Sequence, residues 1–126
     1  MPLVKLWMLH GKSPEFLRTA ADCVHEALVA QANVPADDRF QIIQQLDADS
    51  LIAHPTYAGV NRSADLMIIE ITLNQGRTLE VKKSLYADIV ARLGRALDVR
   101  PDDVLISLLE VTKENWSFGN GLATYG

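Results

Sequence analysis

The chain has 126 residues and a mass of 13.9 kDa, which is the size of a single domain. Apolar residues make up 48% and charged residues 22%, the composition of a water-soluble globular protein with its own hydrophobic core. The net charge of −4 argues against nucleic acid and anionic membranes as partners, because both bind basic surfaces.

The first half of the sequence predicts a strand, a helix and a second strand. Leu3 to Leu9 and Phe40 to Leu46 are short, apolar-rich segments with partial alternation, as in strands. Between them, apolar residues recur at helical spacing from Leu17 to Leu28. Ser13 and Pro14 are typical of the start of a helix, so we expect the helix to begin there.

The second half repeats this order after a connector. Residues 47 to 64 contain Asp, Asn, Pro and Gly among scattered apolar residues, and we expect them to join the two halves. Leu66 to Leu73 and Val104 to Val111 are the expected strands, and apolar residues recur at helical spacing from Leu85 to Leu97. Thr78 is the expected N-cap of this second helix.

A tandem duplication explains the repeated order. A shift of 65 positions, with no gap, places Gly11 to Glu15 on Gly76 to Glu80. The same shift places Val34 to Asp38 on Val99 to Asp103. Two motifs in one ungapped register rarely arise by chance, so the sequence indicates two copies of one structural unit.

The duplication predicts one domain over residues 1–126, built from β-α-β halves at about 1–60 and 65–126. Each crossover makes its two strands parallel. Together the halves predict an α/β fold, an α+β sandwich in which a four-stranded mixed sheet carries two helices on one face. Phe40, Ile42 and Ile43 give apolar groups to both faces of one strand, so we expect other copies of the chain to cover the face without helices.

Features found in only one half are the better candidates for function. The aspartate pairs at positions 37/38 and 102/103 occur in both halves, and turn or capping duty explains them. Several polar and aromatic residues have no counterpart under the shift. These residues are Pro2, Arg39, Gln41, Trp116 and Phe118.

Pro2 is the most informative of these residues. A small second residue favours removal of the initiator methionine, which would leave a rigid secondary amine at the N-terminus. An α-amine has an ordinary pKa of about 7.7–8.0, so it can act as a general base or acid near neutral pH. The alternative is a proline without a catalytic role, because proline is a common residue.

Arg77 is the second candidate. It immediately precedes the predicted N-cap of the second helix, where the helix dipole disfavours a cation unless an anion is bound. A guanidinium beside free helix amides suits a carboxylate, and the alternative is a solvated loop arginine. If the first and third strands run antiparallel, Pro2 faces the loop from Gln75 to Arg77. The mirror site combines Lys12 with Met67, which has no amine, so we expect one competent site per chain.

The remaining reactive residues form no recognisable site. His10, His25 and His54 lack metal-ligand spacing, and we expect them in surface or capping roles. Cys23 is the single cysteine, so it forms no internal disulfide, and we expect it to be buried and inert. The sequence shows neither a signal-peptide pattern nor an apolar run of ~20 residues, so we expect a cytoplasmic protein with no membrane span.

Four segments taken together resemble the tautomerase superfamily, and most closely its malonate semialdehyde decarboxylase-like branch. They are Met1 to Leu3, Asp38 to Gln41, Arg77 to Glu80 and Trp116 to Gly119. The resemblance covers nearly the whole chain. It implies a duplicated β-α-β subunit with an amino-terminal proline, a homotrimer, and no metal or organic cofactor.

The resemblance also implies roles for individual residues. Pro2 would transfer the proton, Arg77 would bind a substrate carboxylate, and Asp38 would be a polar partner beside the amine. The partner molecule would be a small carboxylate. Further substrate contacts are expected from Arg39, Gln41, Gln75, Trp116 and Phe118.

The stretch from Asn74 to Arg77 departs from the decarboxylase pattern. That pattern has two arginines separated by one residue, and here Gln75 replaces the first. A second cation would help polarise a carbonyl oxygen, so its loss favours a less demanding reaction, keto–enol tautomerisation of a phenylpyruvate-like 2-oxo acid. The alternatives are decarboxylation or hydration of a 3-oxo acid such as malonate semialdehyde, and a non-catalytic ferredoxin-like binding module.

Overall fold

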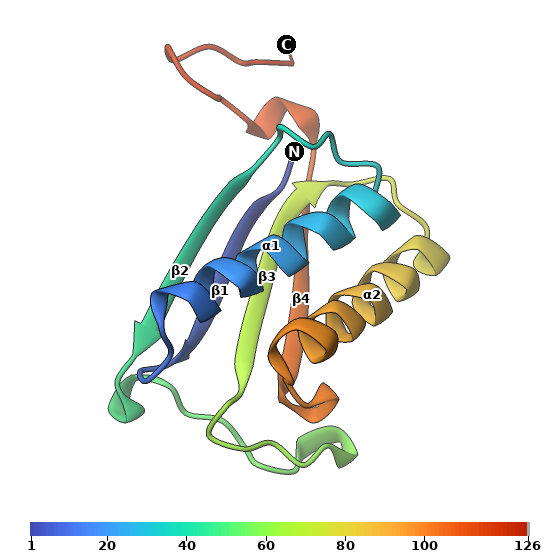
Figure 1. The fold of residues 1–126 in the computed structure, drawn as a ribbon. Coiled ribbons are helices and arrows are strands. Elements are labelled where there is room, and N and C mark those ends of the chain that lie inside the picture. Colours follow the sequence, from blue (N-terminus) through green and yellow to red (C-terminus); the bar gives the residue numbers. More distant parts are fainter. Residues whose placement is uncertain (126) are drawn as a thin grey trace.

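The computed structural model describes residues 1–125 and contains two successive β-α-β units (Figure 1). The connector between them carries only short 3₁₀ turns. The strand bounds agree with the sequence-based prediction, except that the third strand begins and ends one residue later. The elements are β1 (Leu3–Leu9), α1 (Pro14–Gln31), β2 (Phe40–Leu46), β3 (Met67–Asn74), α2 (Leu79–Leu97) and β4 (Val104–Val111).

The four strands form one mixed sheet in the order β2-β1-β3-β4. β1 is parallel to β2 and β3 is parallel to β4, whereas the central strands β1 and β3 run antiparallel. Leu3 pairs with Thr72 in that central register, so the start of β1 lies beside the end of β3. Both helices lie on the same face of the sheet (Figure 1), and the predicted fold class is confirmed.

The two helices begin in the same way, as the duplication predicts. The side chains of Ser13 and Thr78 each accept a hydrogen bond from the backbone N–H three residues later. Gly11 and Gly76 precede these caps with φ of 123° and 121°, a conformation that favours glycine. The repeated motifs in the sequence therefore encode the strand-to-helix turn of each unit.

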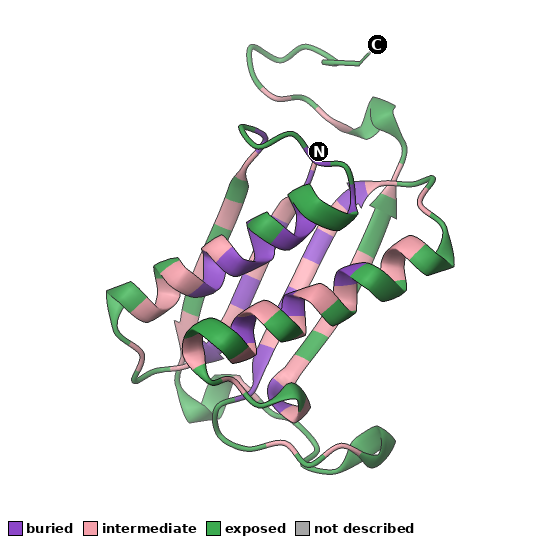
Figure 2. Ribbon diagram, turned by 45° about the vertical axis from the view of Figure 1, so that its right-hand side comes forward, coloured by how far each residue is buried: buried purple, intermediate pink, exposed green. Residues whose placement is uncertain are grey.

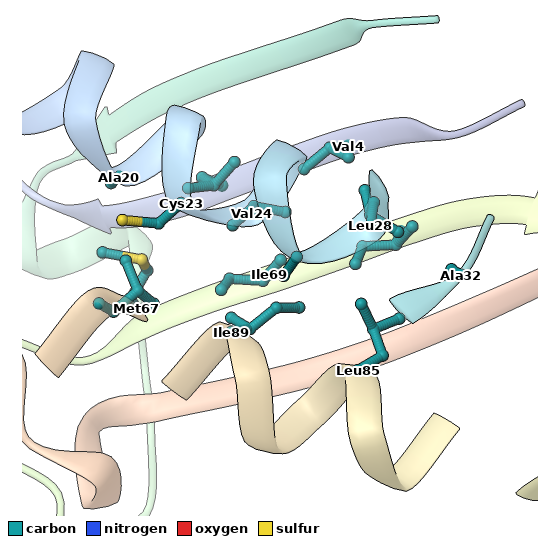
Figure 3. Packing of buried hydrophobic residues seen from close by; sticks show 14 of the residues in the cluster. Val4, Ala20, Cys23, Val24, Leu28, Ala32, Met67, Ile69, Leu85 and Ile89 are labelled. Carbon is teal, nitrogen blue, oxygen red and sulfur yellow. The ribbon is translucent and has the colours of Figure 1, made fainter. Parts of the chain in front are cut away.

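The hydrophobic core lies between the sheet and the two helices (Figures 2 and 3). Alternate residues of β1 and β3 point into it and meet the inward stripes of α1 and α2. Within residues 1–125, no helix is long and apolar enough to cross a membrane. Among the fully buried side chains of the core are Val4, Leu6, Met8, Val24, Leu28, Ile69, Ile71, Leu85, Ile89 and Leu93.

The opposite face of the sheet is largely apolar, and no helix within residues 1–125 lies over it. On its outer strands, Phe40 and Ile42 are 50% and 53% exposed, and Leu109 is 53% exposed. Lys5 and Glu70 lie between them and approach each other to 3.9 Å. Ile43 points the other way and packs against the core, so β2 presents apolar groups on both faces as predicted.

Candidate active site

A pocket opens at the end of the sheet where β1 begins. It has a volume of about 230 Å³, and Figure 1 shows that both ends of the chain lie at this end of the sheet. Pro2 is buried and forms part of the pocket wall. The lining residues are Pro2, Leu3, Phe40, Trp116, Ser117 and Phe118.

Aromatic rings form one wall of this pocket. Trp116 and Phe118 stack with ring centroids 5.3 Å apart, and Phe40 lies 5.7 Å from Phe118. The indole Nε1–H of Trp116 donates a 2.7 Å hydrogen bond to the side-chain oxygen of Asn74, at the end of β3. Tyr125 meets Phe118 edge-on at 6.0 Å. The sequence-predicted apolar wall of Trp116 and Phe118 therefore lies beside Pro2.

Tyr125 brings a hydroxyl group to the same region. Desolvation, and then the negative charge of Asp38, raise the pKa of its phenol, so the phenol stays protonated at neutral pH. The tail folds back because the backbone N–H of Phe118 donates to the side-chain oxygen of Thr124 at 3.0 Å. The tail thus covers the end of the sheet at which Asp38 lies.

Asp38 is a buried carboxylate without a hydrogen bond from the chain. It is 9% exposed, and neither of its oxygens accepts a hydrogen bond within residues 1–125. The amino group of Met1 lies 3.1 Å from Oδ2, which is an ion-pair distance. Burial of a charge without hydrogen-bond partners is costly, and this arrangement is typical of a functional group.

Asp103 occupies the equivalent position in the second half and differs in the contacts of its side chain. It is 1% exposed, and its carboxylate accepts hydrogen bonds of 2.7 Å from both the backbone N–H and the hydroxyl of Ser63. Arg100 donates a further bond of 3.4 Å. The expected turn duty holds for both aspartates, because the N–H of Asp38 donates to the carbonyl oxygen of Pro35 and that of Asp103 to the carbonyl oxygen of Arg100. Their side chains differ, since within residues 1–125 the carboxylate of Asp103 accepts hydrogen bonds and that of Asp38 does not.

Arg77 is half-buried, and part of its guanidinium is hydrogen-bonded to backbone carbonyl groups. Its Nε and Nη2 donate to the carbonyl oxygen of Ala32 at 3.1 and 2.8 Å, and Nη1 donates to that of Asn74 at 3.0 Å. A guanidinium carries five N–H donors, so one N–H on each terminal nitrogen remains for a ligand. This pair suits a bidentate carboxylate.

Lys12 and Gln75 differ from Arg77 in their surroundings. Lys12, the mirror residue of Arg77, donates to Asp65 at 2.7 Å. Gln75 is exposed, and its side chain makes no hydrogen bond within residues 1–125. The antiparallel central strands bring the start of β1 and the loop after β3 to one end of the sheet, as the sequence argument required.

Arg39 and Gln41 lie outside the pocket. Arg39 pairs with Asp22 of α1 at 2.6 Å and donates to Gln41 at 2.7 Å, while the Gln41 amide donates to the carbonyl of Ala21 at 2.8 Å. The hydrogen bond from Arg39 is the main cause that lowers the pKa of Asp22. Both residues therefore face α1, and within one chain the structure does not bring them to Pro2.

The sequence reasoning missed Asn74 and misjudged His25. Asn74 joins Trp116 to Arg77, but no local pattern marks it, because its partner is 42 residues away. His10 and His54 are exposed as expected, whereas His25 is buried. Within residues 1–125, no group of three or more His, Cys, Asp or Glu side chains could hold a metal ion.

Comparisons with known proteins place this arrangement in context. Two family models, both described as tautomerase enzyme, match residues 38–119 and 2–61. The probable tautomerase YusQ of Bacillus subtilis (strain 168) is 40% identical over 123 residues, which cover 98% of this chain and 97% of that protein.

Two solved structures of malonate semialdehyde decarboxylases are also similar. The first, described for its decarboxylase and hydratase activities, has a TM-score of 0.91 and 29% identity, covering 98% of this chain and 95% of its own. The second, an FG41 enzyme inhibited by 3-bromopropiolate, has a TM-score of 0.90 and 37% identity, covering 98% and 93%.

The two equivalent aspartates give a first prediction. Asp103→Ala should lower the free energy of unfolding by about 2–4 kcal/mol, because it leaves the donors of Ser63 unpaired. Asp38→Ala should change it by less than about 1 kcal/mol, because no hydrogen bond is lost. Urea unfolding monitored by circular dichroism measures both, and equal losses would contradict the assignment of different roles.

Proposed function

The chain belongs to the tautomerase family, and on this premise we propose that it catalyses the keto–enol tautomerisation of a phenylpyruvate-like 2-oxo acid. The observation that carries the proposal is the buried carboxylate of Asp38, which accepts no hydrogen bond within residues 1–125 and lies 3.1 Å from the amino group of Met1, one residue ahead of Pro2. This pair lies at the end of the sheet that holds the aromatic pocket.

The base in this proposal is the amine of Pro2, exposed by removal of Met1. The amine takes a proton from the carbon next to the keto group, and the electron pair of that C–H bond forms the C=C bond. The C=O π electrons move to oxygen, and this oxygen takes a proton from water to complete the enol. The protonated amine then gives its proton to the hydroxide so formed, which restores the amine and the water with no net gain or loss of protons.

The surrounding residues bind the substrate in this proposal. The free N–H groups of Arg77 would hold the carboxylate, and the stacked rings of Trp116 and Phe118 would pack against the substrate's aromatic ring. Gln75 would donate to the keto oxygen. Arg39 and Gln41 would contribute only to a neighbouring copy's pocket, since both face α1 in their own chain.

Decarboxylation or hydration of a 3-oxo acid such as malonate semialdehyde is the second candidate. The two solved decarboxylases, at 29% and 37% identity, favour it. Against it, Gln75 supplies a neutral donor where a cation would polarise the carbonyl more strongly. Parallel assays with phenylpyruvate and malonate semialdehyde decide between the reactions, because the substrate with the larger kcat/KM identifies the activity.

We further propose a homotrimer, in which other copies cover the apolar sheet face. Light scattering should give three times the chain mass at micromolar concentration. Ile42→Lys places a charge on this face and should dissociate the assembly. Val29→Lys, on the outer surface of α1, should leave it intact. A monomeric wild-type protein would contradict the proposal.

Arg77→Ala should reduce kcat/KM by about 10- to 150-fold, because a charge-assisted bidentate contact contributes about 1.5–3 kcal/mol. The reduction should be absent for a substrate without a carboxylate. Lys12→Ala, at the mirror position, should change activity little. Equal losses in the two variants would exclude a single site per chain.

The decisive variant carries one added residue before Pro2. The addition converts the secondary amine into an amide, which has no useful basicity, so tautomerisation should vanish while the assembly persists. Pro2→Ala keeps a primary amine and should retain reduced activity. Intact mass of the natural protein is the companion measurement, because retained Met1 favours the non-catalytic binding module instead. Full activity in the extended protein would refute the mechanism.

A further inference from the structure

His25 is a buried titratable side chain that the proposed reaction does not use. It lies on α1 with 8% of its surface exposed, and its Nε2 is 2.8 Å from the carbonyl oxygen of Ala36. A carbonyl can only accept, so Nε2 carries the hydrogen and donates it. The neutral Nε2–H tautomer and the imidazolium both make this bond, so protonation of the ring does not break it.

This bond holds the turn that carries Asp38. The turn spans Pro35 to Asp38 and is closed by a 3.0 Å hydrogen bond from the Asp38 N–H to the Pro35 carbonyl. Ala36 lies inside the turn, so a bond from the packed helix α1 to its carbonyl restricts the whole turn. The Asp38 side chain leaves the turn toward the N-terminus, where the amino group of Met1 lies 3.1 Å away, one residue ahead of the Pro2 nitrogen.

The second half of the chain has no such anchor. Val90 stands at the position equivalent to His25, and its side chain donates no hydrogen bond. There the aspartate itself, Asp103, is bonded directly by its neighbours, including Arg100. The position equivalent to Arg100 is Pro35, which offers no donor. The first half thus fixes the backbone and leaves the carboxylate oxygens free, whereas the second half fixes the carboxylate.

We propose that His25 is a positioning residue: by holding the turn through the Ala36 carbonyl, it keeps the carboxylate of Asp38 facing the N-terminal amine. The inference rests on the proposed function, in which that amine belongs to Pro2 and acts as the base. A carboxylate opposite an amine stabilises the charged amine, so displacement of Asp38 makes the amine lose its proton at lower pH. Other ionisable groups at this end include the neutral phenol of Tyr125 and the guanidinium of Arg77. Asp37 and Arg39 flank Asp38 in the chain, and Lys113 and Glu114 follow the end of β4.

The test measures the titration of this amine directly. The protein is labelled with ¹⁵N-proline and freed of Met1, after which Pro2 alone of the five prolines carries a titrating nitrogen. His25→Val introduces the residue found in the second half, and it should move the Pro2 midpoint to lower pH by about one unit. The acid limb of the kcat/KM profile should move with it, and kcat should fall about 3- to 10-fold. His25→Gln keeps a hydrogen-bond donor, so its Pro2 midpoint and its kcat should lie close to those of the wild-type protein.

A double-variant comparison separates positioning from a general loss of structure. In an Asp38→Asn background there is no charge to position, so His25→Val should cause no further change in the midpoint. His10→Val alters an exposed histidine at the opposite end of the sheet and should leave the midpoint unchanged. If the His25→Val protein does not fold, the His25→Phe protein is used in its place, because phenylalanine fills the space of the imidazole and has no hydrogen-bond donor.

Two results overturn the inference, whatever the activity of the wild-type protein. One is an unchanged Pro2 midpoint in the folded His25→Val or His25→Phe protein. The other is a shift of the same size with and without the Asp38 charge. Failure of the proposed function gives a different result, a wild-type protein whose Pro2 amine titrates but which does not tautomerise phenylpyruvate.

Discussion

A buried carboxylate that only an amine approaches is the constraint on which this end of the molecule depends. Asp38 has lost most of its water, and no donor of the chain within residues 1–125 replaces it. The amino group of Met1 lies 3.1 Å from this carboxylate, so Asp38 marks the place of the chain's N-terminus beside the start of β1. The turn before β2 carries the carboxylate, and the tail after β4 lies at the same end of the sheet.

The two halves share one scaffold, but the contacts around their equivalent aspartates, Asp38 and Asp103, differ. Both halves share helix caps, glycine turns and an aspartate before the last strand. In the second half the aspartate is fully hydrogen-bonded, and Lys12 is paired with Asp65, so that end is structural. In the first half the aspartate has no hydrogen bond and Arg77 keeps two N–H groups free. The unbonded carboxylate of Asp38 and the tail after β4 together distinguish the candidate active site from the equivalent end of the second half.

Much of the fold follows from the sequence, because alternation and helical spacing are local and the duplication fixes the topology. The position of Pro2 opposite the Arg77 loop also follows, since antiparallel central strands leave no other arrangement. The different side-chain contacts of Asp38 and Asp103 could not be predicted from the sequence, because Ser63 bonds to Asp103 from 40 residues away in the chain. The orientation of Arg39 and Gln41 could have been predicted from the sequence. Side chains alternate along a strand, so both residues lie on the face opposite Phe40, toward α1.

The aromatic wall belongs to the tail, which follows the last strand and lies outside the repeated β-α-β pattern. Within residues 1–125, hydrogen bonds close the tail upon itself, from Phe118 to Thr124, from Leu122 to Gly119 and from Thr124 to Trp116. The proposed base Pro2 and the proposed carboxylate-binding residue Arg77, by contrast, lie next to β1 and β3 of the sheet that forms the core. Natural variation in the tail can therefore change the side chains that meet a substrate while the duplicated β-α-β body stays the same. Relatives that share the core and differ after β4 are where new substrate preferences should arise during evolution.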